Sequence, residues 1–402
     1  MQKTITPVLS QKGKDLPESP IRKLVQFAVQ AKARGTHVFH LNIGQPDVAS
    51  PKEAIEAVKK SELDLLAYGP SEGTLGFRES LCSYYSKNRI DVSPQDIIVT
   101  AGASEAISFT LSCICDVDDE IIIPEPFYAN YNGFAAASNI KVVPVHSLFE
   151  EQFRLPSIAS IEAKITAKTK AILICNPCNP TGYLYTQEEI EALGELALKH
   201  NIFLIVDEVY REFIHDDVTE FYSVLQSERL KDHAIMIDSV SKRYSLCGAR
   251  IGCIASKNET LIATALKFAH VRLSPATYSL MASEAAINSD ASYLLAVKKE
   301  YTSRKNVLMA ALEQIDGVKV SDPRGAFYCI VELPVDDAEV FSKWLLTDFS
   351  DENQTVMFAP AAGFYSTPGY GTKQIRIGFV LNEKDLLRSA KILEKALQAY
   401  SN

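Results

Sequence analysis

The middle of the chain alternates short runs of β-branched and other apolar residues with longer helix-like segments. Seven runs have the length and composition of buried strands: residues 97–100, 120–123, 141–144, 171–175, 202–206, 234–237 and 251–254. The segments between them, such as 105–115 and 187–200, have helical patterns. Strands that alternate with helices build βαβ units around a largely parallel sheet. The sequence therefore predicts an α/β fold.

Net charge and hydropathy exclude several kinds of partner. The 402 residues include 41 Lys and Arg against 50 Asp and Glu, which gives a net charge of −9. An acidic chain is poorly suited to bind the phosphate backbone of nucleic acid or an anionic membrane surface. No apolar run approaches about 18 residues, and the first twenty residues lack the apolar core of a secretory signal. We therefore expect a cytoplasmic protein with no nucleic-acid or membrane partner.

The cysteines and the common catalytic motifs narrow the function further. Eight cysteines are too few for a disulfide scaffold and favour a reducing compartment. Cys175 and Cys178 match C-x-x-C, but no second pair stands at zinc-ligand spacing, so we expect no metal. The sequence motifs of metalloproteases, α/β-hydrolases, P-loop NTPases and dinucleotide-dependent dehydrogenases are absent.

Polar and aromatic residues follow five of the predicted strands. Ligands of open parallel sheets bind outside the carboxyl ends of the strands, where such residues meet. The five segments are Ala101-Gly-Ala-Ser104, Pro124-Glu-Pro-Phe-Tyr128, residues 176–182, Asp207-Glu-Val-Tyr210 and Asp238-Ser-Val-Ser-Lys242, the last followed by Arg250. Together they offer a phosphate cradle at a helix N-terminus, an aromatic face, an amide, a carboxylate and a lysine. A single anionic, aromatic, carbonyl-bearing cofactor would use all of these groups.

Three of these segments resemble a known family. Asn179-Pro-Thr-Gly182, Asp207-x-x-Tyr210 and Ser239-x-Ser-Lys242 are similar, in order and spacing, to the class I/II aminotransferases of pyridoxal 5′-phosphate (PLP) fold type I, and specifically to the aspartate aminotransferase-like members. The likeness runs from Asn42-Ile-Gly-Gln-Pro-Asp47 to Arg376. It implies a large PLP-binding domain with a mostly parallel sheet flanked by helices (residues 50–290). A smaller α/β domain would comprise residues 1–49, which include an N-terminal arm, and 291–402.

The resemblance assigns roles around the cofactor ring. Lys242 is expected to form the Schiff base with PLP and then to move the proton at the substrate Cα. Asp207 would pair with the pyridinium nitrogen and keep it protonated. Tyr210 and Asn179 would donate to the 3′-oxygen of the ring, and Tyr128 would stack on its face. The catalytic residues are thus expected to be Lys242, Asp207 and Tyr210.

A second set of residues is expected at the cofactor phosphate. The set consists of Gly102, Ala103, Ser104, Ser239 and Arg250. Tyr68 resembles the family tyrosine that reaches the phosphate from the neighbouring subunit, which would make the working unit a homodimer. Beside Gly69 and Pro70, Tyr68 could instead be a simple turn aromatic.

The substrate carboxylate is expected to bind Arg376, which lies in a short alternating strand. Gly44 would let the substrate approach, although a turn would explain this glycine equally well, and Asn179 would also contact substrate. The Asn179–Pro180 bond is a candidate cis peptide by resemblance.

These assignments predict a ping-pong aminotransferase acting on small amino acids and 2-oxo acids. L-Aspartate is the favoured donor and 2-oxoglutarate the expected acceptor. Aromatic amino acids or alanine are the alternatives, since Phe127, Tyr128 and Tyr131 would suit an apolar substrate. Arg272 lies where related enzymes carry a second basic residue for a distal carboxylate, but its spacing to the next proline differs. A PLP-dependent carbon–sulfur lyase of the same fold would share these motifs, whereas a regulator with a DNA-binding domain would need a basic domain that this chain lacks.

Overall fold

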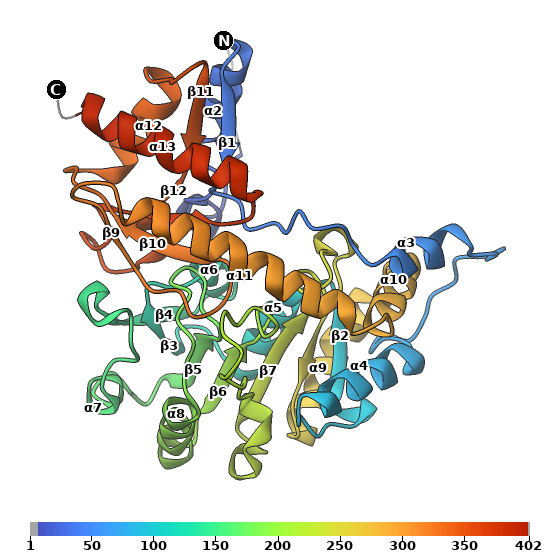
Figure 1. The fold of residues 1–402 in the computed structure, drawn as a ribbon. Helices are drawn as coiled ribbons and strands as arrows, with labels where there is room; N and C mark the ends of the chain where they lie inside the picture. Colours follow the sequence, from blue (N-terminus) through green and yellow to red (C-terminus); the bar gives the residue numbers. More distant parts are fainter. Residues whose placement is uncertain (1–6, 401–402) are drawn as a thin grey trace, which may run out of the picture.

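The computed structural model describes residues 7–400. Its largest sheet has seven strands in the order β2-β8-β7-β6-β5-β3-β4 (Figure 1). Their bounds are β2 Ile97–Thr100, β3 Glu120–Glu125, β4 Lys141–His146, β5 Thr169–Cys175, β6 Phe203–Asp207, β7 Ala234–Ser239 and β8 Gly252–Ala255. All seven predicted strands are thus confirmed, with ends that differ by at most two residues.

The sheet is mostly parallel, as expected for βαβ units. β4, β3, β5, β6 and β7 pair in parallel, whereas β8 is antiparallel to both β7 and β2. The predicted helix at 187–200 is confirmed to the residue, and the one at 105–115 begins two residues earlier, at Ala103. Parallel pairing brings the ends of β5, β6 and β7 to one edge of the sheet.

Helices cover both faces of this sheet. Buried residues of α5, α6 and α9 pack with alternate strand residues such as Ile235 and Ile237. Those of α4, α8 and α10 pack on the other face with residues such as Met236. The bounds are α4 Leu75–Lys87, α5 Ala103–Ile114, α6 Asn130–Ala137, α7 Ile158–Glu162, α8 Gln187–His200, α9 Glu259–Arg272 and α10 Thr277–Ile287. The strand period of two therefore gives consecutive residues to opposite cores.

The N-terminal and C-terminal parts of the chain form a second group of strands. β1 His37–His40 pairs in parallel with β11 Gln354–Met357. β12 Ala359–Pro360, β13 Gln374–Gly378, β10 Tyr328–Glu332 and β9 Lys319–Val320 form a four-stranded antiparallel sheet. The helices that pack with these strands are α2 Val25–Ala33, α11 Ser292–Leu312, α12 Ala338–Thr347 and α13 Glu383–Tyr400. Two other helices from the N-terminal part contact the large domain instead: α3 Lys52–Lys59 packs against α10, and α1 Gln11–Asp15 contacts α6. The domain limits at residues 49 and 290 stay a prediction.

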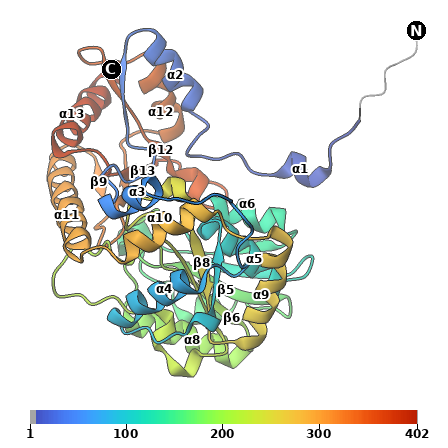
Figure 2. The same cartoon turned by 90° about the vertical axis from the view of Figure 1, so that its right-hand side faces the viewer.

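Figure 2 shows α1 on an extended segment that leads away from α2. The Lys12 ammonium in α1 donates to the Ala137 carbonyl oxygen at 3.2 Å, at the end of α6. The first six residues of the predicted arm lie outside the described residues. None of the described helices is long and apolar enough to cross a membrane.

Candidate active site

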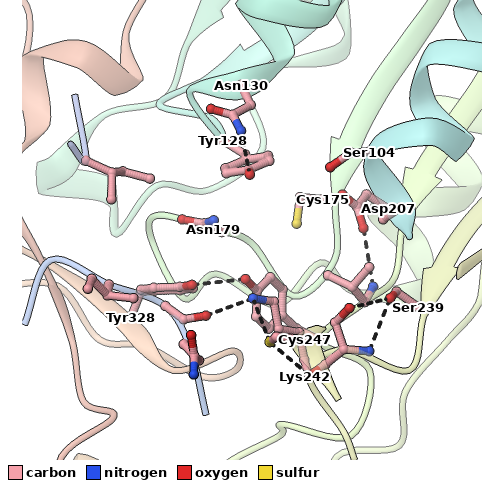
Figure 3. A pocket seen from close by; sticks show the side chains of 18 of the residues that line it. Ser104, Tyr128, Asn130, Cys175, Asn179, Asp207, Ser239, Lys242, Cys247 and Tyr328 are labelled. Atoms are coloured by element: carbon pink, nitrogen blue, oxygen red, sulfur yellow. Dashed lines mark hydrogen bonds between the residues drawn. The ribbon is translucent and has the colours of Figure 1, made fainter. Parts of the chain in front are cut away.

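One cavity of about 680 Å³ opens at the edge where β5, β6 and β7 end. Eleven of the predicted site residues line it: Gly44, Ala103, Ser104, Tyr128, Asn179, Asp207, Tyr210, Ser239, Lys242, Arg250 and Arg376. In Figure 3, Tyr128 and Lys242 lie on opposite sides of the cavity, with Asp207 and Ser239 at a third side. The structure therefore brings together residues that are more than 330 positions apart in the sequence.

Lys242 follows β7 and presents a buried amine. Its Nζ donates to the Gly44 carbonyl oxygen at 2.7 Å and lies 4.0 Å from the Cys247 Sγ. Burial lowers the pKa of the Lys242 amine from its ordinary value, because desolvation disfavours the charged form. A larger neutral fraction makes this amine a better nucleophile at neutral pH.

Asp207 is the last residue of β6 and is buried. Burial raises the pKa of this carboxyl to about 6, although two hydrogen bonds to its oxygens oppose the rise. The Tyr131 hydroxyl donates to Oδ2 at 2.8 Å, and the Val209 backbone N–H donates to Oδ1 at 3.3 Å. The site thus holds a carboxylate that a nearby positive charge, such as a protonated ring nitrogen, would stabilise.

Arg376 lies in β13 and is only 1% exposed. Its Nη1 donates to the Asn179 Oδ1 at 3.0 Å, its Nη2 donates to the Asn42 carbonyl oxygen, and its Nε has no partner among residues 7–400. The Tyr328 ring lies 4.4 Å from the guanidinium carbon. All these partners are neutral, so the buried positive charge is left for an anionic ligand to balance.

The turn between β2 and α5 forms an anion cradle. Ala103 and Ser104 are the first residues of the twelve-residue α5, where backbone N–H groups lack acceptors within the helix. Gly102 has φ +81°, and a Cβ there would lie 2.3 Å from Arg250 Nη2. Gly102 therefore does not line the cavity itself but lets the Arg250 guanidinium approach the cradle.

The remaining predicted residues complete the pocket or lie outside it. The Tyr210 hydroxyl is 3.0 Å from that of Tyr328, and the Asn179–Pro180 bond is cis, as expected. Tyr68 is 82% exposed and does not line the cavity of its own chain, so its role across a subunit boundary stays a prediction. Arg272 also lies outside the cavity: it pairs with Glu105 at 2.9 Å and donates to the Ser71 carbonyl oxygen.

Several residues of the site were not identified from the sequence. Tyr131 was noted only as an aromatic residue that would suit an apolar substrate, yet its hydroxyl donates a hydrogen bond to the Asp207 carboxylate. Tyr328 and Arg22 also line the cavity, but their local sequence carries no motif. Asn42 lies in a segment that resembles the family, yet no role was predicted for it. For Tyr131, the signal was available: it stands three residues after Tyr128, on the same face of the turn into α6.

The donor set fits pyridoxal 5′-phosphate. The cradle at α5 and Arg250 suits its phosphate, Asp207 suits its ring nitrogen, and Lys242 suits its aldehyde. Arg376, whose buried charge has only neutral partners, suits a substrate carboxylate.

Comparison with known proteins agrees with this geometry. The sequence profile described as aminotransferase class I and II matches residues 36–393. An aspartate aminotransferase of Bacillus subtilis is 31% identical over 391 residues, covering 95% of this chain and 96% of that protein. The structure of Thermus thermophilus aspartate aminotransferase with maleate is 25% identical, with a TM-score of 0.88 and coverage of 97% of this chain and 100% of that chain. Alanine aminotransferase from Pyrococcus furiosus is 28% identical, with a TM-score of 0.89 and coverage of 98% and 100%. The chain belongs to the class I and II aminotransferases, which are PLP-dependent enzymes of fold type I.

Proposed function

We propose that this aminotransferase moves the amino group of L-aspartate, its favoured donor, to a 2-oxo acid such as 2-oxoglutarate in two half-reactions at one site. The observation that carries the proposal is that two arginines, Arg376 and Arg22, line the cavity in addition to Arg250, which is assigned to the phosphate. A dicarboxylate has two negative groups, and these two cations would bind one each.

The residues of the chain divide the chemistry among them. When bound, PLP supplies a carbonyl carbon that accepts the amino group and a conjugated ring that withdraws electrons from the substrate Cα. Lys242 would hold the cofactor and, once displaced, move a proton at Cα. Asp207, kept in place by Tyr131, would hold the ring nitrogen protonated.

The residues across the cavity from Lys242 and Asp207 would orient the substrate. Arg376 and Asn179 would fix the α-carboxylate, and the Tyr128 ring would cover the cofactor face and exclude water. Gly44 faces these residues: a Cβ at this position would lie 1.6 Å from the Tyr328 hydroxyl oxygen, so only glycine fits. Ala103, Ser104, Ser239 and Arg250 would hold the phosphate.

The distal carboxylate is assigned to Arg22. Its side chain is exposed at the cavity, and no hydrogen bond or ion pair of its guanidinium is found within residues 7–400. Burial raises the pKa of the Tyr128 hydroxyl and Asp207 acts in the same direction, while Arg376, Arg22 and Arg250 act to lower it. Asn42 connects Arg376 with the residue before Arg22: its Nδ2 donates to the Ile21 carbonyl oxygen at 2.9 Å, and its backbone carbonyl oxygen accepts from Arg376. In the same comparison, the Thermus thermophilus enzyme was solved with maleate, a dicarboxylate.

A kinetic comparison of amino-acid donors tests this assignment. In the PLP-loaded enzyme, Arg22→Gln should lower kcat/KM for aspartate by about 10- to 100-fold, the worth of one charge-assisted hydrogen bond, and leave kcat/KM for alanine almost unchanged. Lys23→Gln is the matched control, because Lys23 lies beside Arg22 but pairs with Glu339. If wild-type enzyme prefers alanine or an aromatic donor, the aspartate assignment is wrong. If ammonia is released in amounts equal to the 2-oxo acid, the lyase alternative replaces transamination.

The assembly is proposed to be a homodimer in the cytoplasm. The segment before α4 is apolar and exposed, with Leu65 at 77% and Leu66 at 57% exposure next to Tyr68. A second copy covering this segment would bury these side chains and bring Tyr68 to a neighbouring phosphate site. Light scattering of the purified protein checks the assembly, and cell fractionation checks the location.

A further inference from the structure

Each of four residues assigned to the cofactor has a charged residue directly beside it in the sequence. The pairs, given as site residue and charged neighbour, are Asp207 and Glu208, Tyr210 and Arg211, Ser239 and Asp238, and Lys242 and Arg243. The side chains of all four charged neighbours are at most 1% exposed, and none lines the cavity. We refer to Glu208, Arg211, Asp238 and Arg243 as the buried quartet.

The quartet is one continuous ion-pair chain. Arg211 bridges the two acids, with Nη2 2.6 Å from the Glu208 Oε2 and Nη1 3.2 Å from the Asp238 Oδ2. Arg243 Nη1 lies 2.7 Å from the Asp238 Oδ1, which also accepts the Ser239 backbone N–H at 2.7 Å. The chain therefore connects the turn after β6 with the turn after β7.

Residues of neighbouring elements contact the quartet through hydrogen bonds and an aromatic ring. The Glu208 Oε1 accepts hydrogen bonds from the Ser223 hydroxyl at 2.9 Å and the Val224 N–H at 3.0 Å. From α4, the Tyr85 hydroxyl donates to Asp238 at 2.7 Å, and the Tyr84 ring lies 4.4 Å from the Arg243 guanidinium carbon. The quartet thus sits on the α4 face of the sheet, while its sequence neighbours face the cavity.

Stability alone does not explain such a cluster. Removing four charges from water costs several kcal/mol for each ion, and apolar residues of similar size often serve equally well or better. Position is a better explanation, because each quartet residue is one peptide bond from a residue of the site. The two positive and two negative charges also cancel, so an intact quartet adds little net field to the cavity.

We propose that the buried quartet positions Asp207, Tyr210, Ser239 and Lys242 for the amino-transfer reaction and does so without a net charge. The quartet residues are positioning residues, since none touches the cavity. The proposal rests on the proposed roles of Lys242 and Asp207 but not on the identity of the substrate. Other charged or titratable groups act on Lys242 directly, and they are Cys247, Arg376, Asp207 and Arg250.

Charge-altering substitutions test the proposal in the PLP-loaded enzyme. Asp238→Asn leaves the quartet with a net charge of +1, and Arg243→Met leaves it with −1. A positive charge disfavours protonation at the Lys242 nitrogen and a negative charge favours it. The pH midpoint of the visible absorption band of the bound cofactor should therefore fall by about one unit in Asp238→Asn and rise by about one unit in Arg243→Met.

The double variant Asp238→Asn/Arg243→Met is the decisive measurement. Glu208 and Arg211 remain paired in it, so its midpoint should return to within about 0.3 units of wild type, and its kcat should exceed that of both single variants. Arg388→Met, which removes a pair with Asp351 at 2.7 Å, is the control, because neither residue lines the cavity; it should lose stability without moving the midpoint.

Three results would overturn the proposal: midpoints that shift in the same direction, midpoints that do not shift, or losses that simply add in the double variant. If neither single variant folds by circular dichroism, the double variant decides alone. A wild-type midpoint there supports the proposal, and a missing cofactor band overturns it. If the wild-type enzyme and Lys242→Ala showed the same absorption band, the proposed function itself would be refuted. The failure of the proposed function is therefore distinguishable from the failure of this proposal.

Discussion

Replacing Arg376 by methionine should separate activity from stability. The guanidinium is buried, its partners are neutral, and burial lowers its pKa, so the folded protein carries an uncompensated charge when no substrate is bound. Methionine removes that desolvation cost of several kcal/mol. It also removes two hydrogen bonds to neutral oxygens, worth about 1.5–3 kcal/mol each, and an aromatic contact worth about 1–2 kcal/mol. The terms nearly cancel, and we expect the free energy of unfolding to stay within about 2 kcal/mol of wild type.

The effect on catalysis should be large and of one sign. Two charge-assisted hydrogen bonds to a carboxylate are worth about 3–6 kcal/mol, so Arg376→Met should lower kcat/KM by roughly 10²- to 10⁴-fold for every amino acid. Steady-state kinetics and urea unfolding of the cofactor-free protein, followed by the fluorescence of Trp344, measure the two effects.

Two further comparisons sharpen this prediction. Maleate at 100 times its dissociation constant should stabilise the wild-type protein by about 2.7 kcal/mol and leave the variant unchanged. Arg304→Met is the contrasting case, because Arg304 pairs with Asp47 and Glu300 and its loss should destabilise the protein by about 1–3 kcal/mol. A variant at Arg376 that keeps kcat/KM within tenfold of wild type would refute the assignment of the carboxylate site.

Other predictions concern the cofactor side of the cavity and the assembly. Lys242→Ala should abolish turnover while PLP still binds non-covalently, which dialysis and absorbance can show; normal turnover would sink the assignment. Burial raises the pKa of Asp207 to about 6, so in the cofactor-free protein this group lowers stability as pH rises from about 4 to 6. Asp207→Asn should therefore be more stable than wild type above pH 6, by about 3 kcal/mol at most, and no different below about pH 4; chemical unfolding at several pH values checks it. In PLP-loaded enzyme the same variant should lose orders of magnitude in kcat. Tyr68→Phe should weaken PLP binding several-fold if a partner subunit supplies this hydroxyl, and equal cofactor affinity would leave Tyr68 with only a turn role.

The sequence was sufficient for the sheet and for one wall of the cavity. Asp207 and Ser239 end strands, and Lys242 follows one, whose β-branched composition identifies them, and parallel pairing then places these residues together. On the opposite wall, Arg376 was assigned its role through the family resemblance, and Tyr328 was not identified. Tyr328 and Arg376 meet because β10 and β13 pair antiparallel, a long-range contact that leaves no local pattern.

The N-terminal segment shows the same limit. The sequence around Arg22 carries no motif, and only the fold shows that this stretch borders the cavity, which Ile21 and Arg22 line. Arg272 was considered for the distal carboxylate because of its position in the sequence. In the fold, however, its guanidinium pairs with Glu105 and donates to backbone carbonyl oxygens. Sequence position identified a basic residue there, but its partners in the fold decide whether its charge is free.

The buried charges are of two kinds: those that have no opposite charge beside them and would bind a ligand, and those that are already paired and position other residues. Asp207 and Arg376 are buried with neutral partners, so each is stabilised when a ligand brings the opposite charge. Asp238 and Arg243 are equally buried but already paired, so a ligand gains nothing from them. The same sheet edge therefore carries buried charges without an ion-pair partner on the cavity side and ion-paired charges on the opposite face. Since an uncompensated charge costs stability until substrate and cofactor arrive, the cofactor-free protein should gain more stability from PLP and maleate together than its apolar contacts alone would give. If Arg376→Met loses this extra stabilisation by the two ligands and Arg388→Met keeps it, the extra stabilisation comes from the uncompensated charge of Arg376.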